Sequence, residues 1–273
     1  MNPNPQQNSE TFVTFTGGLG AQIFSAAIYY YLKGKGRNIY ADLDYFKQIG
    51  KTATAGNKGE ASHWNYELGE YGLPLEGFST KKLEKTFFKR NKPHVISDGT
   101  EKLELAIEAL RQRKIKEFFP IKRSIVEECH KISAGNDYLC IHIRRGDYVN
   151  VTSHLVLVDD MDFVNLAKSI SSFITTAIVI SDSEVSDIVK EKLTVFFADC
   201  SFIVGGDLHV AHALIRQAKY LICSNSQFGL SGALLNEVVQ QVFLPTKWFG
   251  DAVSKNLQIP INALCRFQIL SIN

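Results

Sequence analysis

Short apolar runs alternate with amphipathic stretches along most of the chain, and this order predicts β-strands followed by α-helices. In the first half, strands are expected over residues 11–15 and 37–41, with a glycine turn over 17–20 and a helix over 21–33 between them. A charged amphipathic helix is expected over residues 101–118, and a second helix follows Pro120 and ends near Lys131. Residues 48–80 show no clear period, which is typical of long functional loops.

The alternation is more regular after residue 137. It predicts strands over residues 138–143, 176–181, 201–204, 220–223 and 242–244, and helices over 160–173, 184–197, 207–219 and 228–239. A regular β-α-β-α order indicates a parallel sheet covered by helices on both faces, so the expected fold class is α/β. Residues 133–136 are typical of a linker, which divides the chain into domains 1–134 and 135–273.

Composition narrows the classes of protein that fit. The 273 residues are 45% hydrophobic, enough for real cores, and the net charge of +2 argues against a nucleic-acid binder. Residues 1–10 do not have the pattern of a signal peptide, and no run approaches the ~18 apolar residues that cross a bilayer. The five cysteines are widely spaced and lack a Cys-x-x-Cys pair, so we expect a reduced, cytoplasmic protein.

The strand over 138–143 runs directly into His142-Ile-Arg-Arg-Gly-Asp-Tyr148. Two adjacent guanidiniums at a strand end repel each other unless an anion lies between them, and the arginine fork matches phosphate oxygens. This motif therefore predicts a site for a diphosphate. Because side chains alternate along a strand, His142 and Arg144 should share a face while Arg145 points elsewhere. In a second interpretation, Arg145 forms an ion pair with Asp147 that shapes the loop.

Two further turns have the residues of phosphate sites. Gly17-Gly-Leu-Gly-Ala-Gln22 joins a strand to a helix whose first N–H groups can receive an anion, although a tight turn explains the glycines equally well. The segment Cys223-Ser-Asn-Ser-Gln-Phe-Gly229 also joins a strand to a helix. Its serines can cap the helix or hold phosphate oxygens, and the two roles are compatible.

Two patterns suggest a metal only weakly. Asp42-Leu-Asp44 has the Asp-x-Asp spacing of metal-dependent sugar-nucleotide enzymes, but a strand end followed by a capping aspartate has the same sequence. His209 and His212 lie three apart on an expected helix without a third ligand of suitable spacing. No metal site is therefore expected.

Taken together, the motifs resemble the α-1,2-fucosyltransferase family of bacteria and animals. The matching segments keep the family's order along most of the chain: Gly17 to Phe24, His142 to Tyr148, Ile180 to Ser183, Ser224 to Phe228, Gly232 to Asn236 and Leu244 to Trp248. The resemblance implies a GT-B-like fold of two Rossmann-like domains, with the acceptor on the N-terminal side and the nucleotide in the C-terminal domain. It implies inverting transfer of L-fucose from GDP-β-L-fucose, without a metal or other cofactor, to galactose O2 of a glycan such as a β-galactoside.

The resemblance also assigns roles to residues. Arg144 is expected on the β-phosphate, Arg145 supports the loop or the second phosphate, and Asp147 is a candidate base by position, although an aspartate beside two arginines is a poor base near neutrality. His142 is expected at the nucleotide end, and the diphosphate itself is an alternative proton acceptor. The implied donor-binding residues are Gly18, Leu19, Gly20, His142, Arg144, Asp182, Ser224, Asn225, Ser226, Gln227 and Phe228.

Several positions depart from the family pattern. Ala21 replaces an asparagine, Ser183 replaces the second aspartate of its element, and residues 229–231 replace an aromatic segment. Ala211 stands where relatives tend to carry an aspartate near the nucleobase, and Asp207, one helical turn earlier, is a candidate to compensate. These changes leave two alternatives open: a catalytically silent sugar-nucleotide binder and a fucosyltransferase of another linkage. The glycine-rich turn suggests a third, a Rossmann-type oxidoreductase, and the missing Gly-x-Gly-x-x-Gly counts against it. Lys81 to Lys92 is a basic run that suits either a solvated face or peripheral contact with the inner face of a bacterial membrane.

Overall fold

The structure is a computed structural model of the chain. It describes residues 10–46, 65–82, 93–97, 100–150, 156–245, 248 and 268–270, apart from the side chains of Thr100, Asp147, Asn150 and residues 268–270. The chain forms two compact units, Met1–Pro120 and Ile121–Asn273. The sequence predicted a boundary after residue 134, which assigns the helix over Arg123–Ile132 to the first domain. In the structure this helix belongs to the second unit.

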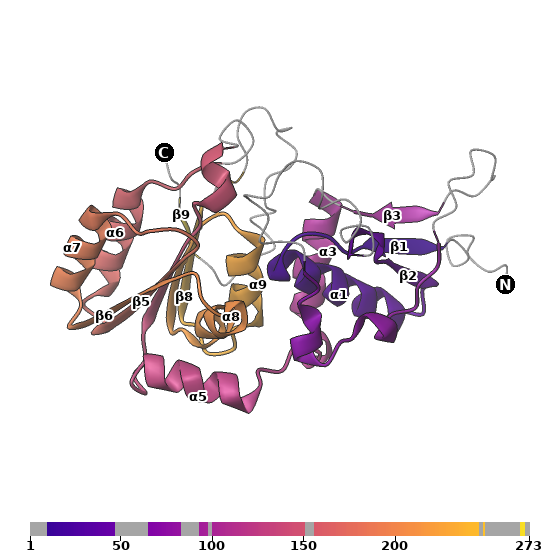
Figure 1. The fold of residues 1–273 in the computed structure, drawn as a ribbon, viewed down its shortest axis with the longest axis horizontal. Helices are drawn as coiled ribbons and strands as arrows, with labels where there is room; N and C mark the ends of the chain where they lie inside the picture. The colour runs from indigo at the N-terminus through magenta and orange to yellow at the C-terminus, as the bar shows by residue number, and fades with distance from the viewer. Residues whose placement is uncertain are drawn as a thin grey trace. The chain divides into compact units, whose positions relative to one another are not determined.

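The N-terminal unit is built on a parallel sheet in the order β2-β1-β3 (Figure 1). Helix α1 follows β1 through the glycine turn and packs against α3, and an apolar stripe that includes Ile23, Phe24 and Ile28 is fully buried. The elements of this unit are β1 (Thr11–Thr14), α1 (Leu19–Gly34), β2 (Ile39–Asp42), the 3-10 helices η2 (Leu68–Tyr71) and η3 (Leu75–Gly77), β3 (His94–Ile96), α3 (Thr100–Leu110) and α4 (Arg113–Lys116).

The N-terminal unit differs from the sequence prediction in two places: one predicted helix is broken, and one strand was not predicted. The single helix expected over residues 101–118 is broken, because Gln112 has an extended backbone (φ −81°, ψ 122°) between α3 and α4. After the break, Ile115 and Phe119 are buried, so the change of direction lets both side chains reach the core. Strand β3 was not expected, since three residues of which two are exposed give no readable alternation.

The C-terminal unit has the parallel α/β architecture that its alternation predicted, with one further strand at the sheet edge, residues 268–270, that was not predicted. All its strands are parallel, in the order β6-β5-β4-β7-β8-β9. The chain builds outward from β4 to β6 on one side and from β7 to β9 on the other, so the switch point where open α/β sheets bind ligands lies between β4 and β7. The elements are α5 (Arg123–Ile132), β4 (Leu139–Ile143), η4 (Gly146–Asn150), α6 (Asp160–Ile170), β5 (Thr176–Ser181), α7 (Asp187–Phe196), β6 (Asp199–Val204), α8 (Leu208–Gln217), β7 (Tyr220–Cys223), α9 (Gln227–Leu235), β8 (Gln241–Pro245) and β9 (Gln268–Leu270).

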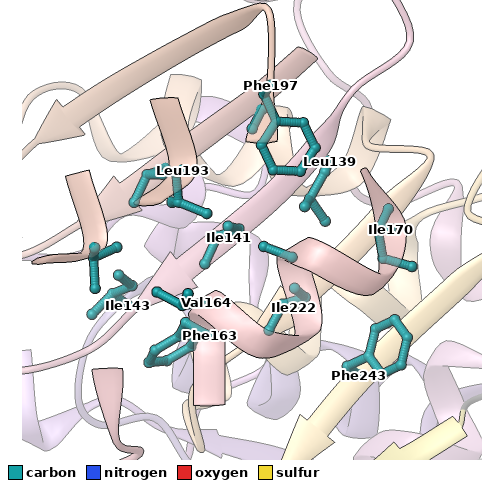
Figure 2. Close-up of a cluster of buried hydrophobic side chains, with 14 of the residues drawn as sticks. Leu139, Ile141, Ile143, Phe163, Val164, Ile170, Leu193, Phe197, Ile222 and Phe243 are labelled. Atoms are coloured by element: carbon teal, nitrogen blue, oxygen red, sulfur yellow. The ribbon is translucent and has the colours of Figure 1, made fainter. Parts of the chain in front are cut away.

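Alternate residues of the central strands face two different helical layers. Leu139, Ile141 and Ile143 of β4 join a buried apolar cluster with Phe163 of α6 and Leu193 of α7, as Figure 2 shows. On the opposite face α8 and α9 cover the sheet (Figure 1). This division decides where the residues after β4 are directed, because the same alternation continues toward the strand end.

Helices α8 and α9 approach each other closely. A Cβ atom on Gly232 of α9 would lie 2.5 Å from Cγ2 of Ile215 in α8, so this contact excludes any side chain at residue 232. The tight contact fixes α9 against α8, and with it the turn at residues 224–226 that precedes α9.

Candidate active site

The carboxyl end of β4 carries an ion pair between Arg144 and Asp182. Nη1 of Arg144 lies 2.6 Å from Oδ2 of Asp182, which follows the neighbouring strand β5. The two side chains are 16% and 24% exposed, so water screens the pair less than it would at an open surface. The guanidinium carbon also lies 5.4 Å from the ring centre of Tyr148. Arg144 is therefore held in place at the strand end.

Asp182 binds the main chain as well. Its Oδ1 accepts hydrogen bonds from the backbone N–H of Arg145 (2.8 Å) and of Gly146 (3.2 Å). A Cβ atom at residue 146 would lie 2.4 Å from Oδ2 of Asp182. Glycine is required at this place because the carboxylate approaches the backbone so closely.

Arg145 points away from Arg144, as the strand alternation predicted. Its Nη2 lies 2.5 Å from Oδ1 of Asp160 at the start of α6, and its guanidinium carbon is 5.7 Å from the ring centre of Phe163. Sequence reasoning did not single out Asp160, because an acidic residue in a first helical turn is expected for the helix dipole alone. The side chain of Asp147, the other predicted partner, lies outside the described residues.

The two serines after β7 have different roles. Oγ of Ser226 accepts a hydrogen bond from the N–H of Phe228 (3.2 Å) and caps α9, which confirms the capping interpretation for one of them. Oγ of Ser224 instead accepts from the N–H of Arg144 (2.9 Å), and the N–H of Ser224 donates to the carbonyl of His142 (2.9 Å). Ser224 thus continues the pairing of β4 and β7 beyond the sheet.

Asn225 connects three loops at this edge. Its Nδ2 donates to the carbonyl oxygens of Val156 and Trp248, both at 2.8 Å, and its main-chain carbonyl accepts from the hydroxyl of Tyr148 (2.9 Å). The side chain is 2% exposed. This geometry favours a framework role for Asn225, whereas the neighbouring Gln227 and Phe228 are partly exposed at the start of α9.

His142 lies beneath this edge and is almost fully enclosed. It is 5% exposed, and its ring centre lies 5.5 Å from that of Phe228. Among the residues that the structure describes, Nδ1 of His142 is buried without a hydrogen-bond partner. Burial, and then the nearby Arg144, lower the pKa of His142 to about 4. A neutral, covered imidazole favours a packing role more than direct contact with a ligand.

This buried histidine should make the C-terminal unit sensitive to acid. The pKa of His142 is lower in the folded protein, at about 4, than its ordinary value of 6.5, so stability is full above pH 6.5 and falls as the pH decreases toward 4. We expect the free energy of unfolding to lose about 2 kcal/mol from this group by pH 5. Urea unfolding of the wild type and of His142→Gln at pH 7.5 and pH 5 measures this, with a smaller loss expected in the variant. Equal losses in both proteins would refute the assignment.

In the N-terminal unit, the predicted glycine turn lies at the start of α1. Gly17 has φ +71°, and Gly18 precedes the helix without a side-chain cap. Leu19 and Gly20 are buried in the first turn. Gln22 is fully buried, and its amide donates to the carbonyls of Gly17 (2.9 Å) and Asn65 (2.8 Å) and accepts from the N–H of Glu67 (2.9 Å). The glutamine of this motif therefore ties the turn to residues 65–67.

The weaker sequence patterns have local structural explanations. Oδ1 of Asp42 accepts from the N–H of Asp44 (3.1 Å), which is the capping arrangement. His212 is buried, with Nε2 3.0 Å from Oγ of Ser231. Oδ1 of Asp207 caps α8 through the N–H groups of residues 209 and 210. In the part of the chain that the structure describes, no three His, Cys, Asp or Glu side chains are grouped closely enough to hold a metal ion.

Comparison with known proteins decides the family. The sequence pattern of glycosyl transferase family 11 matches residues 95–255, more than half of the chain. The chain belongs to glycosyl transferase family 11. This confirms the fucosyltransferase family that the motifs predicted, and the matched region contains both arginines, Asp182 and the turn at residues 224–226. No curated protein matches the chain by sequence.

A solved structure supports the fold, and a second one is similar to the chain. POFUT1 in complex with GDP matches with a TM-score of 0.50 and 10% identity over 87% of this chain and 98% of that one. A glycosyl transferase family 9 protein from Veillonella parvula matches with a TM-score of 0.48 and 12% identity, over 97% of this chain and 86% of the other. The likeness to POFUT1, together with the parallel sheet in each unit, shows the predicted GT-B-like α/β fold. In the described part of the chain, no helix is long and apolar enough to span a bilayer.

Proposed function

We propose that this family 11 protein transfers L-fucose from GDP-β-L-fucose to O2 of a galactose in a glycan acceptor, with inversion at the anomeric carbon and without a metal ion. The observation that carries the proposal is the family match over residues 95–255, with Arg144 at the carboxyl end of its central strand. POFUT1, which shares the fold, has been solved with GDP, and this supports a GDP-sugar as the donor.

The chemistry of the reaction explains why an arginine suits this place. Breaking the bond between fucose and diphosphate develops negative charge on the departing GDP. A divalent ion neutralises that charge in some enzymes, and a fixed guanidinium supplies a positive charge with hydrogen bonds to the same oxygens. In this proposal Arg144 contacts the β-phosphate, while Arg145, paired with Asp160, supports the loop.

The remaining residues that the sequence predicted for the donor lie at the starts of helices α9 and α1. Gln227 and Phe228 lie in the first turn of α9, which offers the positive end of a helix dipole, while the N–H of Phe228 donates to the capping Oγ of Ser226. In the N-terminal unit, the Gly18–Gly20 turn offers backbone N–H groups to an anion. Either Asp147 or the departing diphosphate accepts the proton of the acceptor hydroxyl. His142, Ser224 and Asn225 belong to the framework beneath this site.

Product analysis tests the proposal. The purified chain is incubated with GDP-fucose and an array of β-galactosides in the presence of EDTA, and GDP release is measured together with the mass and linkage of the product. We expect an α-1,2-fucosylated galactoside and no loss of turnover in EDTA. GDP-mannose and UDP-galactose serve as control donors. Binding of GDP-fucose without any product would instead identify a catalytically silent binder, and a product of another linkage would refute the galactose O2 assignment.

A further inference from the structure

We propose that Asp182 is a positioning residue, which holds the Arg144 guanidinium and the turn after β4 in the arrangement that receives the diphosphate, without binding the donor itself. The inference rests on the proposed function, since it assigns Asp182 a role that acts through Arg144. It also replaces the direct donor contact that the family resemblance implied for this residue.

The contacts of Asp182 use both of its oxygens within the protein. Oδ2 lies 2.6 Å from Nη1 of Arg144, and Oδ1 accepts from the N–H groups of Arg145 and Gly146. An ionised carboxylate has no hydrogen-bond donor, and its charge repels a diphosphate. Direct binding of the donor's phosphates by Asp182 is therefore unfavourable, whereas an indirect effect through Arg144 follows from the geometry.

Arg144 is fixed from both neighbouring strands. Its backbone N–H donates to Oγ of Ser224, which follows β7, and its guanidinium contacts Asp182, which follows β5. Strand β4 lies between β5 and β7 in the sheet. The main chain and the side chain of one residue are thus held separately, and this restricts the guanidinium more than a single contact would. Such prior ordering matters, because a displacement of about 1 Å in a reacting group costs on the order of 100-fold in rate.

The arrangement also requires an aspartate in particular. An asparagine can still accept from the two backbone N–H groups through its Oδ1. Its NH₂ group would then face Nη1 of Arg144, and no hydrogen bond forms because both groups are donors. A glutamate carries an extra methylene, and the carboxylate already lies so close to Gly146 that a Cβ atom there would be 2.4 Å from Oδ2. Asp182→Asn therefore removes the guanidinium contact while it retains the turn.

The test combines kinetics with binding for Asp182→Asn. We expect kcat to fall about 10- to 100-fold, while the KM for GDP-fucose does not rise, because Arg144 remains charged and loses only its fixed orientation. Calorimetric titration with GDP should keep a stoichiometry near that of the wild type, which excludes a loss of folded protein. Asp137→Asn is the matched control: it breaks the 2.6 Å pair with Lys219 at the amino ends of β4 and β7, and should leave activity unchanged.

A double-mutant cycle decides whether Asp182 acts through Arg144. In an Arg144→Lys background, Asp182→Asn should lower kcat by a much smaller factor than in the wild type, because the oriented fork is already absent. If the double variant lowers kcat by the product of the two single factors, Asp182 does not act through Arg144 and the inference is overturned. If Arg144→Ala abolishes turnover but Asp182→Asn behaves like the wild type, this inference alone fails. If Arg144→Ala keeps near-wild-type turnover, the role of Arg144 in the proposed function fails.

Discussion

Arg144→Ala should lower kcat for fucosyl transfer by about 100- to 1000-fold, the usual loss when one preorganised charge donor is removed from a reacting centre. The fold should survive, because Oδ1 of Asp182 still accepts from the backbone N–H groups of residues 145 and 146. Initial rates with GDP-fucose, with thermal unfolding of the same samples, measure both effects. A stable variant with near-wild-type turnover would remove Arg144 from its role.

The neighbouring arginine provides the matched control. Arg145→Ala removes the pair with Asp160 and the contact with Phe163, both of which lie on the α6 side of the strand. We expect a smaller loss of turnover than for Arg144→Ala, since only Arg144 is assigned to the β-phosphate. Arg144→Lys should fall between the two, because it retains the charge but not the planar fork. A greater loss of turnover for Arg145→Ala than for Arg144→Ala would reverse this assignment.

The largest effect on stability is expected at Asn236, where α9 ends. This side chain is fully buried and makes four hydrogen bonds: Nδ2 donates to the carbonyls of Ile215 and Ala218, and Oδ1 accepts from the N–H groups of Val238 and Val239. Asn236→Ala leaves these backbone groups without partners. We expect a loss of about 3–5 kcal/mol in the free energy of unfolding, measured in urea.

An isosteric variant separates hydrogen bonding from volume. Asn236→Asp keeps the size and the two accepted bonds, but it places a carboxylate oxygen against the carbonyls of Ile215 and Ala218. It should therefore destabilise the protein about as strongly as alanine does. If Asn236→Asp retained wild-type stability, the hydrogen bonds would not be the source of the effect.

The sequence predicted the central strands well because burial on both faces makes them continuous apolar runs. The expected ranges 176–181 and 220–223 coincide with β5 and β7, and the predicted divergence of Arg144 and Arg145 follows from the alternation along β4. Helix ends were less accurate: the helix expected to reach residue 239 ends at Leu235, because Asn236 has an extended backbone and bonds the N–H groups that follow.

Long-range partners were not predictable in the same way. Nothing local at Asp160 or Asp182 indicates that each meets an arginine from the end of β4, since such pairs depend on which strands and helices become neighbours. Likewise, neither the end of helix α3 before Gln112 nor the three-residue strand β3 leaves a periodic pattern of apolar residues in the sequence. The sequence thus indicated residues that gather at the carboxyl ends of β4, β5 and β7, whereas the structure adds the ion pairs of Arg144 with Asp182 and of Arg145 with Asp160.

The affinities of GDP and GMP for the wild type and for Arg144→Ala test the central claim most directly. If Arg144 binds the β-phosphate, the wild type should bind GDP about 10-fold or more tightly than GMP, because GMP lacks that phosphate. In Arg144→Ala the ratio of the two dissociation constants should approach one, while the affinity for GMP stays nearly unchanged. A ratio that remains at the wild-type value in Arg144→Ala would contradict the account.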